Sequence, residues 1–344
     1  MSEKQITLQE WRELYAVAIA LKKLKPWEWM WDSEIFGVQD PETGEVGYCC
    51  VMGRLGEHFG LAVYRGSEGL EGYMKVQSGD VDAYSSDALH YQKCLMVSFE
   101  DRDFLAPKDR KIVKQLGLKF RGDNAWPLFR DWTPGYHPWF ITPEETRYLI
   151  QLIPQAIDVT ERFKQDLALL APPQPGRYLV RVPRLGPDGL IWEDEWKEPV
   201  PPPEPGPVDA LFDSSSLEKI RETITRRAGI WEIDYFYSSE TVREKQERPY
   251  FPRMMLCVDH ETGLILFFHL VSAHSQWINE FIEAFLEKLE KLGSLPGKIL
   301  VKENGFALFK TAAAGLEVET EVVDDLPVIN EVRAHMEQFG KQKQ

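Results

Sequence analysis

Six prolines fall within nine residues near the middle of the chain, in the run Pro199-Val200-Pro201-Pro202-Pro203-Glu204-Pro205-Gly206-Pro207. Proline lacks a backbone N–H and fixes its own φ, so such a run cannot continue a helix or a central strand and favours extended polyproline geometry. At 344 residues the chain is also longer than one typical domain. We therefore predict two domains, residues 1–198 and residues 208–344, joined by a semi-rigid linker over residues 199–207.

The composition indicates folded domains without a membrane segment. Hydrophobic residues make up 43% of the chain and aromatic residues 12%, which supplies a core and excludes a disordered chain. No apolar run approaches the roughly 20 residues that a membrane span needs, and the opening residues lack the apolar core of a signal peptide. The four cysteines, Cys49, Cys50, Cys94 and Cys257, form no CxxC pair. We therefore expect a reduced, cytoplasmic protein.

The charge balance bears on the partners of this protein. Its formal net charge is −15, and each predicted domain has more Asp and Glu than Lys and Arg. Contacts to phosphates dominate the affinity of proteins for nucleic acid, so this acidic balance disfavours a nucleic-acid partner. A protein partner is compatible with the composition, but the sequence does not identify one.

The first domain is predicted to be α+β. Thr7 and Glu10 have the spacing of a capping box for a helix that ends before Pro26. A second helix is expected from Ser67, and a long helix from Thr142 with a proline in its first turn. Apolar runs between turn residues predict the strands VGYCCVM, FGLAVYRG, CLMVSFED and AWPLFRDW, and a hairpin of RYLVRV with GLIWEDEW.

The second domain has a more informative order of elements. A helix over residues 215–227 is followed by the strand GIWEIDYFYSS and by the hairpin MMLCVDHETGLILFFHLV. An amphipathic helix begins at Trp277. The remaining elements are a strand over 298–302 that ends in a turn at 303–305, a helix to about Ala314, a strand over 316–323 and a helix over 327–339. The order β-β-β-α-β-α-β-α predicts an α/β domain with a mixed sheet and helices on both faces.

Three acidic residues occupy notable places in this order. The motif Trp231-Glu232-Ile233-Asp234 puts Asp234 on the first strand, Glu303-Asn304-Gly305 follows the fourth strand, and Glu331 lies on the last helix. With these residues, positions 225–340 resemble the ribonuclease H-like cores of retroviral-type integrases and transposases. That family keeps an acid in W-x-x-D on the first strand, another in D-N-G after the fourth strand and a third on the final helix. The resemblance implies a ribonuclease H-like fold.

The resemblance also implies a chemistry. Converging carboxylates in such cores hold two Mg²⁺ ions, which activate a water or hydroxyl and stabilise the leaving oxygen. The resemblance therefore implies that Asp234, Glu303 and Glu331 are catalytic and bind Mg²⁺ or Mn²⁺. This chain departs from the family pattern because Glu303 stands where the family keeps the shorter Asp. If the strand continues as far as the adjacent Lys302, that side chain is expected to point to the opposite face, so it is not a clear replacement for the charge of a metal.

Three hypotheses for function follow. In the first, the ribonuclease H-like domain is non-catalytic, has no cofactor and serves binding or scaffolding. In the second, the protein is a Mg²⁺-dependent nuclease or transposase that uses Asp234, Glu303 and Glu331. In the third, the aromatic-rich first domain is a protein-interaction module. The first domain resembles a bacterial two-domain family of unknown function in its segments PW (26–27) to GYCCVMG and LAVYRGSEG. Whether the chain is an enzyme stays open.

Other candidates in the sequence favour structural roles. Cys49 or Cys50 could pair with His58, but adjacent strand residues face opposite sides, and no local group completes a nucleophilic site. We therefore predict buried structural thiols. His269 and His274 flank the long helix and are a weak zinc candidate, since no typical ligand spacing is present. The glycines of this region match no phosphate-binding motif and predict tight turns.

Three tryptophans alternate after the first helix, at Trp27, Trp29 and Trp31. If the segment is extended, their side chains share one face, because strand residues alternate between faces. Packing in a core or between domains is the favoured interpretation, and a platform for stacking a ligand is the alternative.

Overall fold

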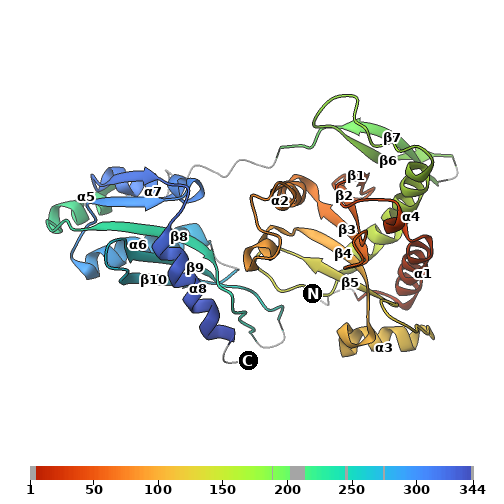
Figure 1. The fold of residues 1–344 in the computed structure, drawn as a ribbon, viewed down its shortest axis with the longest axis horizontal. Coiled ribbons are helices and arrows are strands. Elements are labelled where there is room, and N and C mark those ends of the chain that lie inside the picture. The colour runs from red at the N-terminus through yellow and green to blue at the C-terminus, as the bar shows by residue number, and fades with distance from the viewer. Residues whose placement is uncertain (1–4, 188, 202–213, 245–246, 274–275, 342–344) are drawn as a thin grey trace. The chain divides into compact units, whose positions relative to one another are not determined.

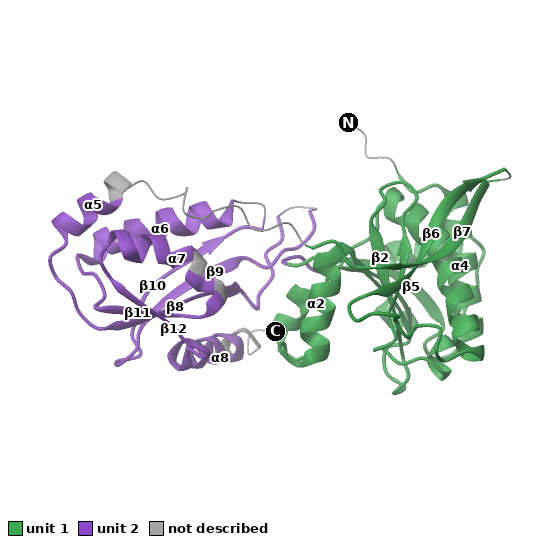
Figure 2. Cartoon of the chain, turned by 90° about the horizontal axis from the view of Figure 1, so that it is seen from above, with its two compact units in different colours: residues 1–134, 138–202 green, residues 135–137, 203–344 purple. Residues whose placement is uncertain are grey.

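The computed structural model of the chain describes residues 5–187, 189–201, 214–244, 247–273 and 276–341 (Figure 1). The chain divides into two compact units, residues 1–134 with 138–202 and residues 135–137 with 203–344 (Figure 2). Each unit contains one mixed β-sheet. Most of the predicted linker, residues 202–207, lies outside the described residues.

The first unit has a seven-stranded sheet in the order β5-β4-β3-β2-β1-β6-β7. Neighbouring strands are antiparallel except β1 and β6, which run parallel. The strands are β1 (Phe36–Gln39), β2 (Val46–Met52), β3 (Gly60–Arg65), β4 (Cys94–Glu100), β5 (Trp126–Trp132), β6 (Tyr178–Gly186) and β7 (Gly189–Lys197).

Helices cover both faces of this sheet (Figure 1). α1 and α4 pack together on one face, where they and the strands form the larger apolar core. α2 covers the other face over β2 and β3. The helices of the unit are α1 (Leu8–Leu24), α2 (Gly66–Ser78), α3 (Pro107–Gln115) and α4 (Pro143–Gln165), with short 3₁₀ turns at Pro26–Glu28, Ser86–Tyr91 and Arg102–Phe104.

Local signals in the sequence account for several of these elements. The Thr7 side chain accepts from the Glu10 amide, and the Glu10 carboxylate accepts from the Thr7 amide, so the predicted capping box is confirmed. Cys49 lies in the core under α1 and α4, and Cys50 lies in the core on the opposite face, as strand alternation predicted. The short strand β1 and the helix α3 were not predicted, because neither segment carries a clear apolar period.

The three tryptophans do not share one face, because the segment that carries them is not extended. The segment begins with the 3₁₀ turn Pro26–Glu28, which breaks the two-residue alternation. Trp27 is buried in the core, and Trp29 is partly buried with its Nε1 donating to the Thr160 carbonyl at 3.0 Å. Trp31 is 46% exposed. The three rings therefore have three different environments.

The second unit has a five-stranded sheet in the order β10-β9-β8-β11-β12. β8, β9 and β10 form an antiparallel meander, and β11 runs parallel to both β8 and β12. The predicted order of three strands followed by alternating helices and strands is observed. The strands are β8 (Ile230–Tyr237), β9 (Arg253–Asp259), β10 (Ile265–Val271), β11 (Lys298–Val301) and β12 (Glu319–Val322).

The sheet of the second unit also has helices on both faces, as predicted. α5, α6 and α7 supply the larger core on one face, and α8 packs against β8 and β9 on the other. These helices are α5 (Ser214–Thr223), α6 (Trp277–Leu292), α7 (Glu303–Gly315) and α8 (Pro327–Lys341). Within the described parts of both units, every helix is too short or too polar to cross a membrane.

Two leucines of α6 test how much of the stability of the second unit comes from its larger core. Leu289 is fully buried, whereas Leu292 at the end of the same helix is 38% exposed. We expect Leu289→Ala to lower the free energy of unfolding by about 3 kcal/mol, since it removes apolar contacts and leaves a cavity. Leu292→Ala should lower it by less than about 1 kcal/mol. Urea denaturation of both variants measures the difference, and equal losses would contradict the assignment of the core.

Candidate functional site

Asp234 lies on the central strand β8, on the face that α8 covers. Trp231 and Ile233 belong to the core under α5, α6 and α7, so the alternate residues Glu232 and Asp234 face the other way. Asp234 is only 3% exposed. A buried carboxylate is unfavourable unless charges or hydrogen bonds compensate it, so its partners are the first question about this site.

The partners of Asp234 are positive groups and a backbone amide. Its Oδ2 lies 3.5 Å from Nζ of Lys302, and its Oδ1 accepts from the Tyr235 amide at 2.8 Å. Burial raises the pKa of Asp234 above its ordinary 3.8, while the charges of Lys302 and Arg333 oppose that shift. The carboxylate is therefore compensated by cations from this same chain.

The position of Lys302 corrects the expectation that it points away from the site. β11 pairs with β8 in parallel, with Leu300 beside Glu232. Two residues further along each strand, Lys302 lies level with Asp234 on the same face of the sheet. The strand ends at Val301, and Lys302 keeps an extended backbone as the N-cap of α7. The ammonium group therefore lies beside the buried Asp234 carboxylate.

Glu303 has a different environment from the one predicted. The expected turn at residues 303–305 is instead the first turn of α7, in which the amides of Gly305 and Phe306 donate to the Lys302 carbonyl at 2.9 Å. The Glu303 side chain is exposed. An acidic residue in the first turn of a helix interacts favourably with the helix dipole, so a local structural role accounts for it.

Glu331 is exposed on α8, and its carbonyl oxygen lies 2.9 Å from Nδ1 of His335. Among the described residues, no three His, Cys, Asp or Glu side chains gather closely enough to hold a metal ion. A catalytic role for Asp234, Glu303 and Glu331 stays a prediction that an activity measurement must decide.

Sequence reasoning missed a second buried carboxylate on β8. Glu232 is fully buried, and its carboxylate accepts from the Ile329 amide at 2.9 Å. Nδ1 of His260 lies 2.6 Å from the same carboxylate. Glu232 therefore satisfies the first turn of α8, where helix amides lack partners. The signal for it was present in the sequence, as a second acid two residues before Asp234 on one strand.

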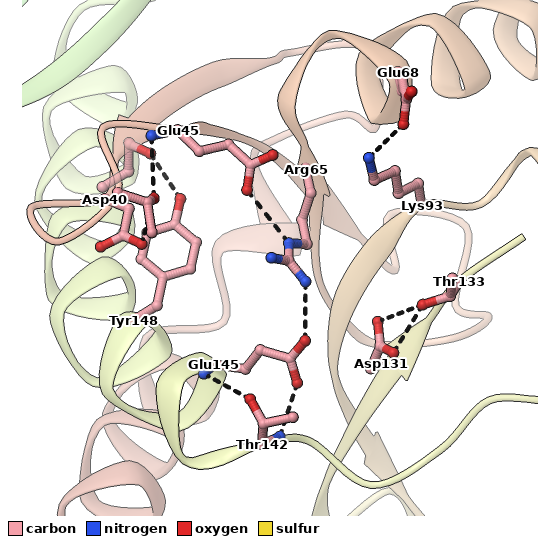
Figure 3. Close-up of polar contacts among 12 residues, drawn as sticks. Asp40, Glu45, Arg65, Glu68, Lys93, Asp131, Thr133, Thr142, Glu145 and Tyr148 are labelled. Atoms are coloured by element: carbon pink, nitrogen blue, oxygen red, sulfur yellow. Dashed lines mark hydrogen bonds and ion pairs between the residues drawn. The ribbon is translucent and has the colours of Figure 1, made fainter. Parts of the chain in front are cut away.

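A polar network in the first unit was also missed (Figure 3). Arg65, at the end of β3, lies between two carboxylates, with Nη1 at 2.9 Å from Glu145 and Nε at 3.5 Å from Glu45. Glu145 also accepts from the Thr142 amide at 2.8 Å in the capping box of α4. The network fastens the first turn of α4 to the end of the sheet.

Burial raises the pKa of Glu145 above its ordinary 4.5, and the nearby Asp131 raises it further. The hydrogen bond from the Thr142 amide and the charge of Arg65 lower it. The neighbouring Glu144 is exposed, and its pKa is lowered by backbone and Arg147 hydrogen bonds. Two adjacent glutamates therefore have opposite shifts.

The cysteine and histidine candidates have structural environments. All four cysteines are buried and free, and burial raises the pKa of both Cys49 and Cys50, which disfavours a nucleophilic thiolate. His58 is exposed with φ +42°. The zinc candidate cannot be placed, because His274 lies outside the described residues.

Family models match both units. Residues 11–181 match a domain of unknown function (DUF7309), and residues 216–337 match a second domain of unknown function (DUF6930). The chain carries two domains of unknown function. This result agrees with the resemblance of the chain to a two-domain family of unknown function. No curated protein and no solved structure matches this chain.

The pH dependence of the free energy of unfolding tests the environments of Glu144 and Glu145 in the DUF7309 domain. The folded protein holds the Glu145 proton more tightly than the unfolded chain, so ionisation costs stability as pH rises above 4.5 through the folded-state pKa. Glu145→Gln cannot ionise. We therefore expect its free energy of unfolding, relative to that of the unmodified protein, to increase from acidic to neutral pH in urea denaturation.

Glu144→Gln is the matched control, because the pKa of Glu144 is lowered. Ionised Glu144 contributes stability above pH 4.5, and this contribution is lost as pH falls through its folded-state pKa. Glu144→Gln should therefore lose stability relative to the unmodified protein toward neutral pH. Equal pH dependence for the two variants would contradict the burial of Glu145.

Proposed function

We propose that the DUF6930 domain is a diverged ribonuclease H-like module that serves binding or scaffolding and does not cleave phosphodiester bonds. The order β-β-β-α-β-α-β-α and the acid on the first strand support the fold assignment. The resembling cores place their second acid directly after the fourth strand, and in this chain that strand is β11.

One observation carries the non-catalytic part of the proposal. The Lys302 ammonium lies 3.5 Å from the buried Asp234 carboxylate, where a metal ligand would otherwise be expected. A fixed positive charge at this distance repels a divalent cation and already compensates the carboxylate. Arg333 adds a second positive charge near Asp234. The pair holds β8 and the start of α7 together without a metal.

Metal binding and nuclease activity test this proposal. We expect no Mn²⁺-induced broadening of the Asp234 amide signal in NMR spectra of the full chain, because Lys302 and Arg333 repel the ion. We also expect that the unmodified chain and Asp234→Ala show the same absence of DNA and RNA cleavage in the presence of Mg²⁺ or Mn²⁺. Broadening at Asp234 together with such cleavage would establish the Mg²⁺-dependent alternative.

Lys302→Met is the informative variant, since it removes the ammonium and keeps a side chain of similar length. Lys310→Met, at an exposed position of α7, is the control for the loss of a lysine. If the charge of Lys302 excludes the ion, Mn²⁺ should affect Asp234 more strongly in Lys302→Met than in Lys310→Met. An equal response would assign the exclusion to another cause.

The edge strand β10 supports a scaffolding role. No described strand pairs with its outer side, and an edge strand presents unpaired backbone groups to any strand that approaches. The sequence of β10, ILFFHLV, contains no Lys, Arg, Asp, Glu or Pro. Phe268 is 51% exposed and Leu270 is 46% exposed. This edge therefore lacks the side chains that usually prevent strand addition.

The other edge strands of the two sheets carry charged residues or proline, which disfavour the addition of another strand. β12 carries Glu319 and Glu321, which pair with Lys298 at 2.9 Å and 2.5 Å. In the first unit, β5 contains a proline and two charged residues, and β7 contains four charged residues. The contrast within one chain indicates that β10 is exposed for pairing.

We infer that the strand added to β10 comes from a second copy of the chain. The net charge of −15 makes most surfaces of two copies repel each other, and β10 is an uncharged strand on which this repulsion is weakest. Antiparallel pairing of β10 with its own copy would join two sheets around a two-fold axis, the commonest symmetry of homo-oligomers.

Light scattering after size-exclusion chromatography tests this assembly. We expect the unmodified chain to form a dimer whose fraction increases with concentration, and Phe268→Lys to be monomeric because it places like charges across the pairing. Val322→Lys, at a 41% exposed position of β12, should remain dimeric. A monomer at all concentrations, or equal effects of both variants, would contradict pairing through β10.

A further inference from the structure

A pocket of about 510 Å³ opens in the first unit where α1 ends. The end of α1, the turn at Gly53–Gly56 and Asp123 with Asn124 surround it. Its size lies within the range of small-molecule sites in proteins.

One wall of the pocket is aromatic. Trp27 lies between Phe59 and Phe99, with ring centroids 5.3 Å and 5.6 Å away. All three rings line the pocket, and all belong to the core cluster or pack against it. Their positions are therefore fixed by the fold, and the wall offers a preformed surface for a flat apolar group.

The rim of the pocket is cationic, although the chain as a whole is acidic. Lys22, Lys25 and Arg54 line it, against two acidic residues. Lys25 pairs with Glu28 at 3.5 Å, and Arg54 lies over the Trp31 ring at 5.1 Å. These two cations have partners but remain exposed.

Lys22 differs from the other two cations of the rim in its burial and in its partners. It is half-buried, and its Nζ donates to the Asn124 carbonyl at 2.5 Å. Its charge lies 5.6 Å from the Phe99 ring centroid, and it forms no ion pair with any described carboxylate. Burial lowers its pKa, and the charge of Lys25 lowers it further. An ammonium has three donors, so an anion in the pocket would complete its coordination.

Backbone conformation adds an independent observation. Lys25 has φ +57° and Asn124 has φ +49°, and both line the pocket. Residues other than glycine are uncommon in this region, and they concentrate at binding and catalytic sites. Lys25 occupies the left-handed cap of α1, where glycine is usual. The cap therefore places a cationic residue, and not glycine, in the lining of the pocket.

We propose that this pocket binds a small anion that carries an aromatic ring. The ring packs against Trp27 and Phe59, and the acidic group accepts hydrogen bonds from Lys22 and Arg54. Phosphate and carboxylate groups share this chemistry, because each offers oxygens that accept from several cationic donors. The proposal concerns the DUF7309 domain and is independent of the role proposed for the DUF6930 domain.

Calorimetric titration of the full chain tests the proposal with two acidic probes, AMP for a phosphate and 4-hydroxybenzoate for a carboxylate. Adenosine and ribose 5-phosphate test the ring and the acidic group separately. We expect at least one acidic probe to bind, adenosine to bind more weakly than AMP, and ribose 5-phosphate more weakly still. The tighter of the two acidic probes identifies the acidic group that the site prefers.

Two variants locate the site. Lys22→Met should weaken binding of the acidic probe about tenfold, the loss expected for one charge-assisted hydrogen bond. Lys23→Met removes an exposed lysine from the same turn of α1 and should leave binding unchanged. Arg54 lies on an exposed turn. We expect Arg54→Gln to weaken binding without disturbing the Lys22–Asn124 contact. This variant therefore still tests the site if Lys22→Met does not fold.

The proposal is overturned if neither acidic probe binds at millimolar concentration, or if AMP binds and adenosine binds as tightly. Equal binding by Arg54→Gln and the unmodified chain also overturns it, as does equal weakening by Lys22→Met and Lys23→Met. Binding that falls with added salt supports an electrostatic contribution, and binding that is insensitive to salt contradicts it.

Discussion

The parallel register between β8 and β11 decides what surrounds the buried Asp234. Because Leu300 lies beside Glu232, the next residue on that face, Lys302, comes level with Asp234. A carboxylate away from water requires positive charge or hydrogen-bond donors. Lys302, Arg333 and the Tyr235 amide supply them. The positive charge that this buried carboxylate requires is therefore provided by the chain itself.

The same principle extends to the buried Glu232 and to the partly buried Glu145. Glu232 is satisfied by the first amides of α8 and by His260, so α8 is held against the sheet by a charge as well as by its apolar contacts. In the first unit, Arg65 and the Thr142 amide satisfy Glu145. In each case an acid that is fully or largely shielded from water joins the start of a helix to a sheet. The interactions of these carboxylates give them a structural role, which is to hold a helix against a sheet.

Several features could be predicted because their causes are local. The capping box of Thr7 and Glu10 depends on residues three apart, and the opposite faces of Cys49 and Cys50 depend on strand alternation alone. The pocket was not foreseen, since Lys22 and Asn124 meet only after about a hundred residues of intervening chain have folded. No periodicity in the sequence reports such a contact.

The sequence alone determined which segments of the second unit are helices and which are strands, because apolar period, caps and turn residues act over a few neighbours. It also indicated that an acid lies on the first strand. Only the tertiary structure decided that Lys302, and not Glu303, stands beside Asp234. That outcome depends on the register of two strands about seventy residues apart, which the packing of the whole sheet selects.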